Sequence, residues 1–585
     1  MPMQQLTVVR AAIGLAQGLA LYLLHAAHLA KAWPATEGML YAGTLAVAVF
    51  VPTVAIAGLG SMRRSTLAIW TIAALGFSAA IGAYDIWREP VTGSADAPRI
   101  VPGFMTWVTL AAATFIVHSL VAAGDADRAA IARYPTYFDV SWKHGVQAVL
   151  CGLFVGAFWG LLWLGASLFM LIKVEFLSSL IKQLWFSIPV TLMTLACAVH
   201  VTDVSAGLVA GARTLKLTLL SWLLPLMTAF AVLFLVALPF AGLEPLWSTR
   251  RATGILLASV AALVFLINAA YQDGLPETPI APILRWSRAI ASVALVPLIV
   301  LAGYGLMLRV QQYGWTPQRI IALACVAVGA CYAAGYAFAV ARSQLALKQL
   351  ERTNIFTASA IVAVLVALVS PIADPARISV ADQVARLRAG EVAPERFDFA
   401  FLRFNAGRYG TEALERLARD GGEPAVMQRV QQALAAKTPW QLREQVQPKA
   451  TPETRAANIT VVHSGGRTAL PDAFLRQEWT GTLQWRVPRC LTAPDKARCD
   501  ALLVDLDGDA QDEIVVIGTP GAAAAFGNVG GQWILLGTLA NINCKGARDA
   551  LKSGGLELVA PKLKDIEVGG QRLRVNTECN PPSTP

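Results

Sequence analysis

The sequence predicts an all-α polytopic transmembrane bundle of about eleven spans, followed by a small periplasmic α+β domain. Hydrophobic residues make up 56% of the chain and charged residues only 15%, against roughly 25% charged residues in soluble proteins. The composition changes to that of a water-soluble protein after the last apolar run, residues 355–372. We therefore expect a transmembrane domain at 1–372, a periplasmic helical neck at 373–450 and a periplasmic β-rich cap at 451–585.

The apolar runs of the first domain alternate with short polar loops. A helix needs about 20 consecutive apolar residues to cross the hydrocarbon core of a bilayer, so the lipid bilayer is the first predicted partner. The runs lie at residues 11–30, 39–59, 66–84, 104–123, 146–172, 188–210, 216–242, 254–272, 289–309, 320–341 and 355–372.

The lysines and arginines of the loops predict the orientation of the spans. If the amino terminus is cytoplasmic, the inner loops carry 13 of these residues and the outer loops 9, which is the sign that the positive-inside rule requires. An odd number of spans then places the chain after residue 372 outside the cytoplasm.

Four cysteines, Cys490, Cys499, Cys544 and Cys579, lie in the tail after residue 372. Disulfides persist outside the cytosol, so an even number here favours a periplasmic tail. Four free thiols in a cytosolic domain are the alternative. Cys490 and Cys499 bracket a short polar turn, LTAPDKAR, so we predict that they pair, which leaves Cys544 to pair with Cys579.

The net charge of +10 does not indicate a nucleic-acid partner. Residues 1–372 hold 22 Lys and Arg against 13 Asp and Glu, whereas the tail holds 26 against 25. The basic excess therefore belongs to the membrane domain, where it sets topology, and the tail has no basic surface excess.

Two patterns divide the tail. Helical periodicity runs from about 379 to 443, with Ser379 as a candidate N-cap. Short β-like runs follow from about 459, namely ITVVH, TLQWRV, ALLVDL, EIVVIGT and QWILLGTL, with glycine and asparagine turns between them. A proline-bearing link near 447–454 joins the two parts.

The segment VDLDGDAQDEIVV, residues 504–516, is the sharpest local motif. Its acidic residues alternate, and Gly508 permits a tight turn, so their oxygens can surround one hard cation. The segment resembles the calcium loops of integrin-type and FG-GAP repeats, although Ala510 stands where glycine is commoner. We predict a structural calcium site; a solvated acidic turn is the alternative. The predicted ligands are Asp505, Asp507, Asp509 and Glu513, with the Gln511 carbonyl.

Ionisable groups inside apolar spans are functional candidates because they are costly there. His200 and Asp203 lie three residues apart and share a helix face, so they are a candidate proton relay or ion site. We favour the other interpretation, in which they hydrogen-bond a neighbouring helix. His25, His28, His118 and Asn268 are interpreted as single interhelix contacts, and Gly152, Gly156 and Gly160 as a site of close helix packing.

No Walker loop, zinc-protease HExxH or serine-hydrolase elbow occurs in the sequence. Multispan glycosyltransferases that use lipid-linked sugars have a similar outline, but they usually carry an acidic pair in the first outer loop. That loop, KAWPATEG, holds only Glu37. An enzyme of this kind is therefore the least favoured function.

Two strings carry a family resemblance: RVQQYGWTPQRI at 309–320 and ISVADQVARLRAGEVAPERFDFAFLRFNAGRYGTEALERLA at 378–418. They resemble the bacterial membrane family catalogued as domain of unknown function 4153. The resemblance implies a polytopic protein of the bacterial inner membrane. It implies no reaction and no catalytic residues.

Two functions remain open from the sequence. In the first, the periplasmic tail is a binding or assembly module for an envelope protein, held at the membrane by the spans. In the second, the spans form the path of a transporter or permease, and the tail gates it or receives cargo.

The predicted orientation can be tested with a reporter enzyme that is active only in the periplasm. Fusion after residue 372 should give activity, and fusion near Arg133 should give none, because these positions lie on opposite sides of the membrane. The reverse pattern would invert the topology and remove the case for a periplasmic disulfide.

Overall fold

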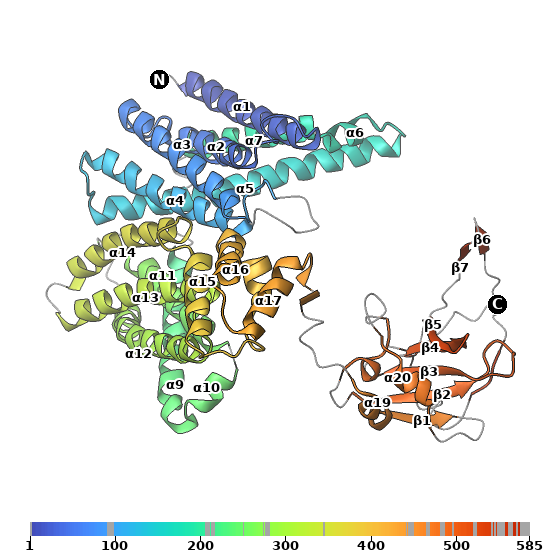
Figure 1. Cartoon of the computed structure of the whole chain (residues 1–585). Helices are drawn as coiled ribbons and strands as arrows, with labels where there is room; N and C mark the ends of the chain where they lie inside the picture. Colours follow the sequence, from blue (N-terminus) through green and yellow to red (C-terminus); the bar gives the residue numbers. More distant parts are fainter. Residues whose placement is uncertain are drawn as a thin grey trace. The chain divides into compact units, whose positions relative to one another are not determined.

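The computed structural model divides into two compact units, Met1–Pro439 and Trp440–Pro585 (Figure 1). Each unit is described by itself. The structure describes residues 3–89, 99–204, 211, 217–249, 251–272, 274, 281–342, 346–439, 441–442, 450–463, 469–479, 486–493, 497–518, 523–539, 542, 544, 546, 556–559, 566–568 and 571–573.

Eleven helices in the described residues are long and apolar enough to cross a membrane, which confirms the predicted number of spans. Large apolar side chains such as Phe240, 88% exposed, and Leu171, 80% exposed, face outward, as lipid contact requires. The spanning helices are α1 (Met3–Leu29), α2 (Gly38–Gly58), α3 (Arg64–Trp87), α4 (Phe104–Asp127), α5 (Tyr134–Leu171), α7 (Leu184–Val204), α9 (Leu223–Ala241), α11 (Ala252–Tyr271), α12 (Pro282–Tyr313), α13 (Pro317–Ala341) and α14 (Ala346–Leu368).

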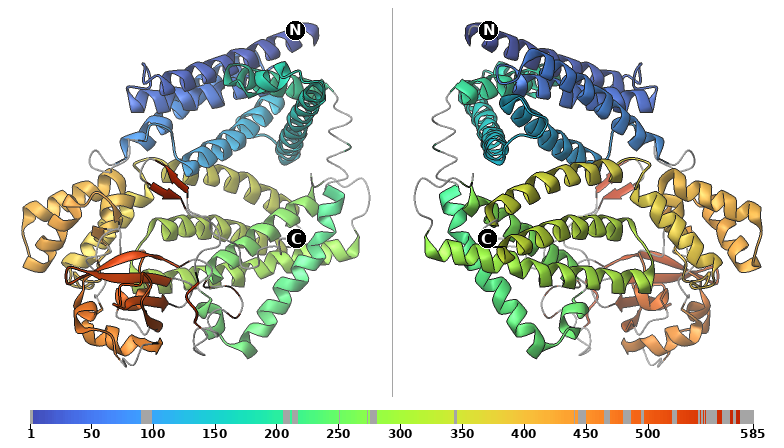
Figure 2. Two further views of the ribbon diagram at one scale, coloured as in Figure 1. Left: turned by 90° about the vertical axis from the view of Figure 1, so that its right-hand side faces the viewer. Right: turned by 90° about the vertical axis from the view of Figure 1, so that its left-hand side faces the viewer.

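The spanning helices form two groups (Figure 2). In the first group α1 lies along α7, α2 along α3, and α5 against α4 and α7. In the second group α12 packs between α11 and α13, and α14 lies along α13. The largest apolar core belongs mainly to the second group and includes Leu263, Ile267, Leu295 and Tyr336. Helix α14 also contacts α4 and α5, so it joins the two groups. Two short helices, α6 (Phe176–Lys182) and α10 (Glu244–Ser248), lie between spans.

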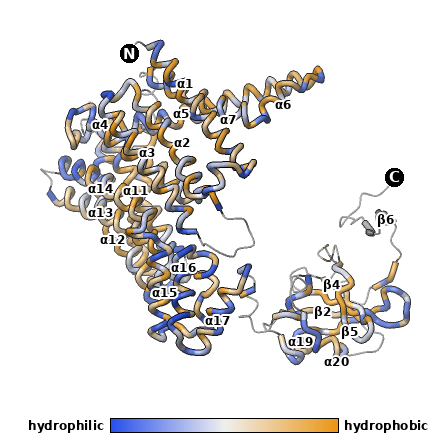
Figure 3. The backbone as a smooth tube through the Cα atoms, turned by 45° about the horizontal axis from the view of Figure 1, so that its top comes forward, coloured by the Kyte–Doolittle hydropathy of each residue, from blue (hydrophilic) through white to orange (hydrophobic). Residues whose placement is uncertain are grey.

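The predicted helical neck belongs to the first unit and packs on the spans. It consists of α15 (Pro375–Arg388), a π-helical turn η1 (Phe401–Asn405), α16 (Gly407–Asp420) and α17 (Pro424–Ala435). These elements are visibly more hydrophilic than the spans (Figure 3). Helix α15 begins at Pro375 because the Asp374 carboxylate accepts hydrogen bonds from the amides of Ala376 and Arg377. The prediction of Ser379 as the cap was therefore wrong.

The expectation of close packing at Gly152, Gly156 and Gly160 was also wrong. The space that a Cβ atom would fill at each position is open, with no other described atom within 4 Å. Regular spacing of small residues permits a close approach, but here α7 packs on a different face of α5, through contacts such as that of Gln147 with Thr202.

The second unit is built on a five-stranded sheet in the order β1-β2-β3-β4-β5. Strand β1 (Ile459–His463) pairs in parallel with β2 (Cys499–Val504), and the other pairs are antiparallel. Strands β3 (Glu513–Gly518), β4 (Ala523–Val529) and β5 (Gln532–Thr538) complete the sheet, and the predicted strand TLQWRV lies mostly outside the described residues. Helices α19 (Pro452–Asn458) and α20 (Asp472–Arg476) precede β2 in the sequence. A hairpin of β6 (Ile566–Val568) and β7 (Gln571–Leu573) follows β5.

Apolar side chains pack on both faces of this sheet. One face forms a core around Phe474, Phe526 and Trp533, and the other buries Leu502, Val515 and Ile517. Burial on both faces explains why residues 501–504 of β2 and 514–517 of β3 are apolar without alternation.

Candidate functional site

A cavity of about 1290 Å³ lies between the two groups of spanning helices. Its walls come from α4, α5, α11, α13 and α14, and residues of the neck line one end. We call it the interhelix cavity. The lining residues that matter below are Thr109, Ser141, Ala324, Cys325, Tyr332 and Asn405.

The interhelix cavity is long and mostly apolar. Along α13 its lining runs from Pro317 to Tyr332, which is about 22 Å at 1.5 Å per residue. This length is most of the thickness of the hydrocarbon core of a bilayer, which is about 30 Å. Val260, Val328 and Leu365 are typical of its middle section.

An ion-pair cluster lies at the end of the cavity beside the neck. The Arg88 guanidinium donates from Nε to Asp85 at 2.9 Å and pairs through Nη1 with Asp374 at 3.3 Å. Tyr84 donates to Asp374 at 2.8 Å, and its hydroxyl lies 2.9 Å from that of Tyr409. Burial alone would lower the pKa of Arg88, but the two carboxylates raise it above its ordinary value. The cluster thus joins α3 to α15 and α16.

A polar network lies at the opposite end of the cavity. Asn268 donates to Tyr336 at 2.8 Å and accepts from Asn354 at 2.7 Å, and Tyr336 donates to Asn354 at 2.6 Å. The hydroxyl of Tyr134 lies within 3.4 Å of both amide side chains. Asn268, interpreted from the sequence as a single interhelix contact, is therefore one member of a network that joins four helices.

His200 and Asp203 lie away from the interhelix cavity and contact α1 and α5. Asp203 accepts from Arg10 at 2.9 Å and from Lys143 at 2.6 Å. His200 Nε2 lies 2.7 Å from the hydroxyl of Thr7. The Arg10 side chain is fully buried, so Asp203 is its counter-charge. These contacts favour the interhelix interpretation over a relay.

Three of the predicted calcium ligands converge at the end of β2. Oxygen atoms of Asp505, Asp507 and Glu513 lie within 4.8 Å of one another. Asp509 is not in this group, and its Oδ1 accepts from the amide of Gln511 at 2.7 Å. Gly508 and Ala510 both have positive φ, so the loop curls around its acidic side chains.

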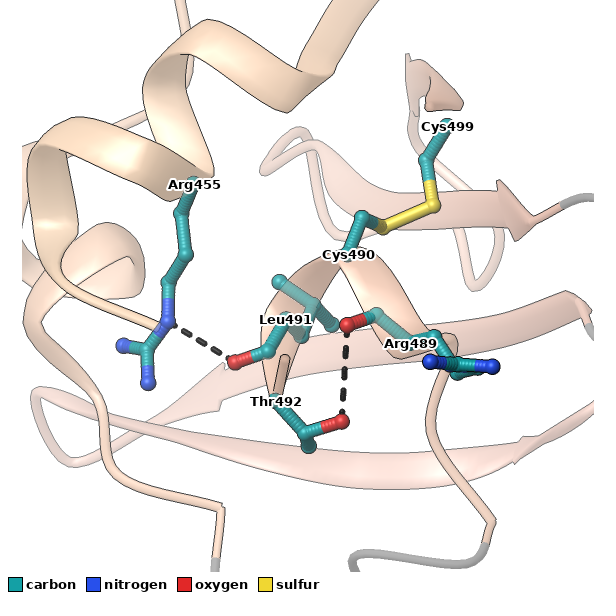
Figure 4. Close-up of a disulfide and its surroundings, with 6 residues drawn as sticks. All are labelled: Arg455, Arg489, Cys490, Leu491, Thr492 and Cys499. Atoms are coloured by element: carbon teal, nitrogen blue, oxygen red, sulfur yellow. Dashed lines mark hydrogen bonds between the residues drawn. A yellow bond between two sulfur atoms is a disulfide. The ribbon is translucent and has the colours of Figure 1, made fainter. Parts of the chain in front are cut away.

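Cys490 and Cys499 form a disulfide at the start of β2, which is the pairing that the sequence predicts. Cys544 is also disulfide-bonded, and Cys579 lies outside the described residues. Figure 4 shows Arg455 near the disulfide between Cys490 and Cys499. Its guanidinium donates to the carbonyls of Leu491, Leu475 and Gln477, and burial lowers its pKa. Among the described residues, the remaining cysteines are free thiols, and Cys325 is exposed within the interhelix cavity.

The two strings that carry the family resemblance both attach the neck to the spans. Gly314, at φ +71°, turns the chain so that the Trp315 amide donates to Asp382 of α15 at 2.7 Å. Gly407 lies so close to the Arg88 carbonyl that a Cβ atom would be 2.2 Å from it, and the Arg408 amide donates to that carbonyl at 2.7 Å. Glycine is required at both positions.

A protein-family model described as domain of unknown function (DUF4153) matches residues 15–418, more than half of the chain. The chain belongs to the DUF4153 family. The resemblance found in the sequence is thereby confirmed. The DUF4153 range covers the spans and most of the neck, and it ends before the second unit. No curated protein and no solved structure matches the chain.

The sequence alone did not indicate the cavity lining. Thr109, Ser141 and Tyr332 are ordinary polar residues within apolar runs, and only the packing of helices distant in sequence brings them to one space. Asp85 and Asp374 gave a usable signal, since each is an acidic residue at the edge of an apolar run.

Replacing Asp203 by Asn should reduce the amount of folded protein. The substitution leaves buried Arg10 without a counter-charge, and breaking a buried pair costs about 3–5 kcal/mol, an upper figure here because Asp203 is 18% exposed. Size-exclusion chromatography of a fluorescent fusion measures the effect. The added change Arg10→Gln should restore much of the loss, whereas a relay role predicts normal accumulation of Asp203→Asn with loss of function.

Non-reducing peptide mapping should recover Cys490 joined to Cys499. The change Cys490→Ser should lower the free energy of unfolding of the second unit by about 2–3 kcal/mol, because the bridge closes a short loop in the unfolded chain. Recovery of Cys490 joined to Cys544 or Cys579 would refute the pairing. Four free thiols would also remove the support that disulfides give to a periplasmic tail.

Proposed function

We propose that the protein is a membrane transporter or permease that binds an amphiphile, a molecule with an extended apolar part, in the interhelix cavity. One observation carries this proposal: a cavity of about 1290 Å³ runs between two groups of spanning helices and is lined mainly by apolar side chains. Sites for drug-sized ligands are roughly 300–1,000 Å³, so there is room here for a larger molecule.

The place of the cavity favours transport over simple anchoring. Two helix groups that meet around a long cavity can rock against each other, which is how many transporters expose a central site to either side. A chain whose spans only held an assembly module would need no such space. The neck lines one end, so it is placed to gate passage at that end.

The proposal includes the cellular location of the protein. We place the protein in the inner membrane of a bacterium, with the amino terminus in the cytoplasm and the second unit in the periplasm. The loop charges, the even number of tail cysteines and the family support this location. A periplasmic or envelope protein that receives the cargo from the second unit would be the partner.

Cys325 provides a native probe of the cavity. Modification of its thiol by N-ethylmaleimide should slow several-fold when an extract of bacterial lipids is added to the delipidated protein, because bound chains cover the thiol. Cys331 lies on the same helix and does not line the cavity, so its rate should stay constant. Mass spectrometry of the peptides follows both sites.

A matched pair of substitutions on α13 controls this experiment. Ala324→Trp fills part of the cavity, and the protein should then retain less co-purified lipid. Ala327→Trp places the same side chain on an exposed face that does not line the cavity, and lipid retention should be unchanged. Equal Cys325 labelling with and without lipid, together with equal retention by the two variants, would refute a lipid-binding cavity.

We also propose that the acidic loop of the second unit holds one structural calcium ion. The convergence of Asp505, Asp507 and Glu513 supports this, since three carboxylates this close repel one another unless a cation, solvent or hydrogen bonds relieve the repulsion, and a calcium ion would do so most directly. A weak site, with Kd on the order of 10⁻⁴ to 10⁻³ M, is typical of extracellular modules.

Calcium should raise the melting temperature of a fragment that spans residues 440–585 by a few degrees. At ten times Kd the gain in stability is about 1.4 kcal/mol. Asp507→Ala should abolish the shift, Asp509→Asn should change it little, and Asp472→Ala, an exposed carboxylate outside the loop, should leave it intact. An unchanged melting curve and no heat of binding at millimolar calcium would leave the loop as a solvated turn.

A further inference from the structure

The charged side chains that line the interhelix cavity are paired with other side chains of the protein. Among the described residues that line it, only Arg88 and Glu89 are charged. Nε and Nη2 of Arg88 contact Asp85, Nη1 contacts Asp374, and Glu89 pairs with Arg99. The cavity therefore presents no charge that is free to neutralise a ligand.

The pairing of both charged residues decides which lipid head groups the cavity can accept. A charged group taken out of water costs several kcal/mol unless a counter-charge and hydrogen bonds replace its hydration. An anionic head beside the neck would compete with Asp85 and Asp374 for the one guanidinium, and a cationic head would compete with Arg99 for Glu89. A head group without net charge avoids this competition, because it either carries no charge or brings its own counter-charge.

Uncharged polar groups are available at both ends of the cavity. Thr109 and Asn405 line the end beside the neck, and Ser141 and Tyr332 line the region toward the other end. Within the part of the chain that the structure describes, none of these four side chains has a hydrogen-bond partner. Thr109, Ser141 and Tyr332 are half-buried and Asn405 is exposed, so their polar groups are accessible from the cavity. A few polar groups placed in this way among apolar walls are suited to hydrogen-bond a ligand.

We propose that the ligand of the interhelix cavity is a lipid whose head group has no net charge, held by hydrogen bonds from Thr109 and Asn405 beside the neck while its chains extend along α13. This rests on the proposed function, since it names the class of amphiphile that the cavity takes. Ser141 and Tyr332 offer the same kind of contact toward the opposite end, so an uncharged head can be hydrogen-bonded at either end of the path.

The test compares lipids that have the same acyl chains and different heads. The full-length protein in detergent is labelled at Cys325 with N-ethylmaleimide in the presence of diacylglycerol, phosphatidylethanolamine, phosphatidylglycerol or phosphatidic acid. Diacylglycerol and phosphatidylethanolamine should protect Cys325 at mole fractions at least about tenfold lower than the two anionic lipids. Protection by diacylglycerol alone or by phosphatidylethanolamine alone identifies an uncharged or a zwitterionic head, and each supports the proposal.

Equal or better protection by the anionic lipids would overturn the proposal and leave the cavity as a lipid site. Protection by none of the four would refute the proposed function as well, so the two failures are distinguishable.

Three variants sharpen the result. Glu89→Gln removes one negative charge at the cavity and should shift the preference toward the anionic lipids, whereas Glu391→Gln, an exposed neck carboxylate that does not line the cavity, should not. Asn405→Leu should weaken protection by the neutral lipids several-fold without reducing the yield of folded protein. An unchanged preference in Glu89→Gln would count against the role assigned to charge.

Discussion

The attachment of the neck to the spans depends on the pairing of Arg88 with Asp85 and Asp374. Asp85 lies in the last turn of α3. It also accepts hydrogen bonds from the Gly103 amide and the Thr106 hydroxyl, so it fixes the start of α4. Asp374 caps α15 with one oxygen and receives Arg88 and Tyr84 with the other. One guanidinium thus orients the third and fourth spans, the first neck helix and the end of the interhelix cavity. Removal of either carboxylate would leave the half-buried Arg88 with one anionic partner instead of two and would loosen the elements that this carboxylate joins.

The cavity persists because polar contacts hold its two ends while its middle is apolar. Beside the neck the contacts are ionic. At the other end the amides of Asn268 and Asn354 and the hydroxyls of two tyrosines join α5, α11, α13 and α14. In a bilayer the helices gain little by closing an apolar gap, since lipid chains fill it as well as side chains do. A long apolar space between the two groups is therefore compatible with a stable membrane fold, whereas in a soluble protein it would collapse.

The sequence predicted what depends on local composition and missed what depends on packing. Span number, the helical neck and most strands follow from apolar runs and periodicity. Strand β4 was not predicted because AAAF is poor in β-branched residues, yet its alanines fit between β3 and β5, where the sheet is covered on both faces. Asp203 and Asn268 were visible as polar residues in spans, but their partners Arg10 and Asn354 lie 193 and 86 residues away. No local pattern connects such pairs.

Two further carboxylates of the spanning helices, Asp125 and Asp203, are paired in a similar way. Asp125 at the end of α4 receives the Arg63 side chain and the Thr66 hydroxyl, and Asp203 receives Arg10 and Lys143. Each of these carboxylates joins helix ends, and neither lines the interhelix cavity. Charge is thus used to fix where helices begin, end and cross, while hydroxyl and amide groups are left to face the cavity. The ligand proposed above would therefore be recognised by shape and by neutral hydrogen bonds, and salt should affect its binding far less than it affects binding at a charge-selective site.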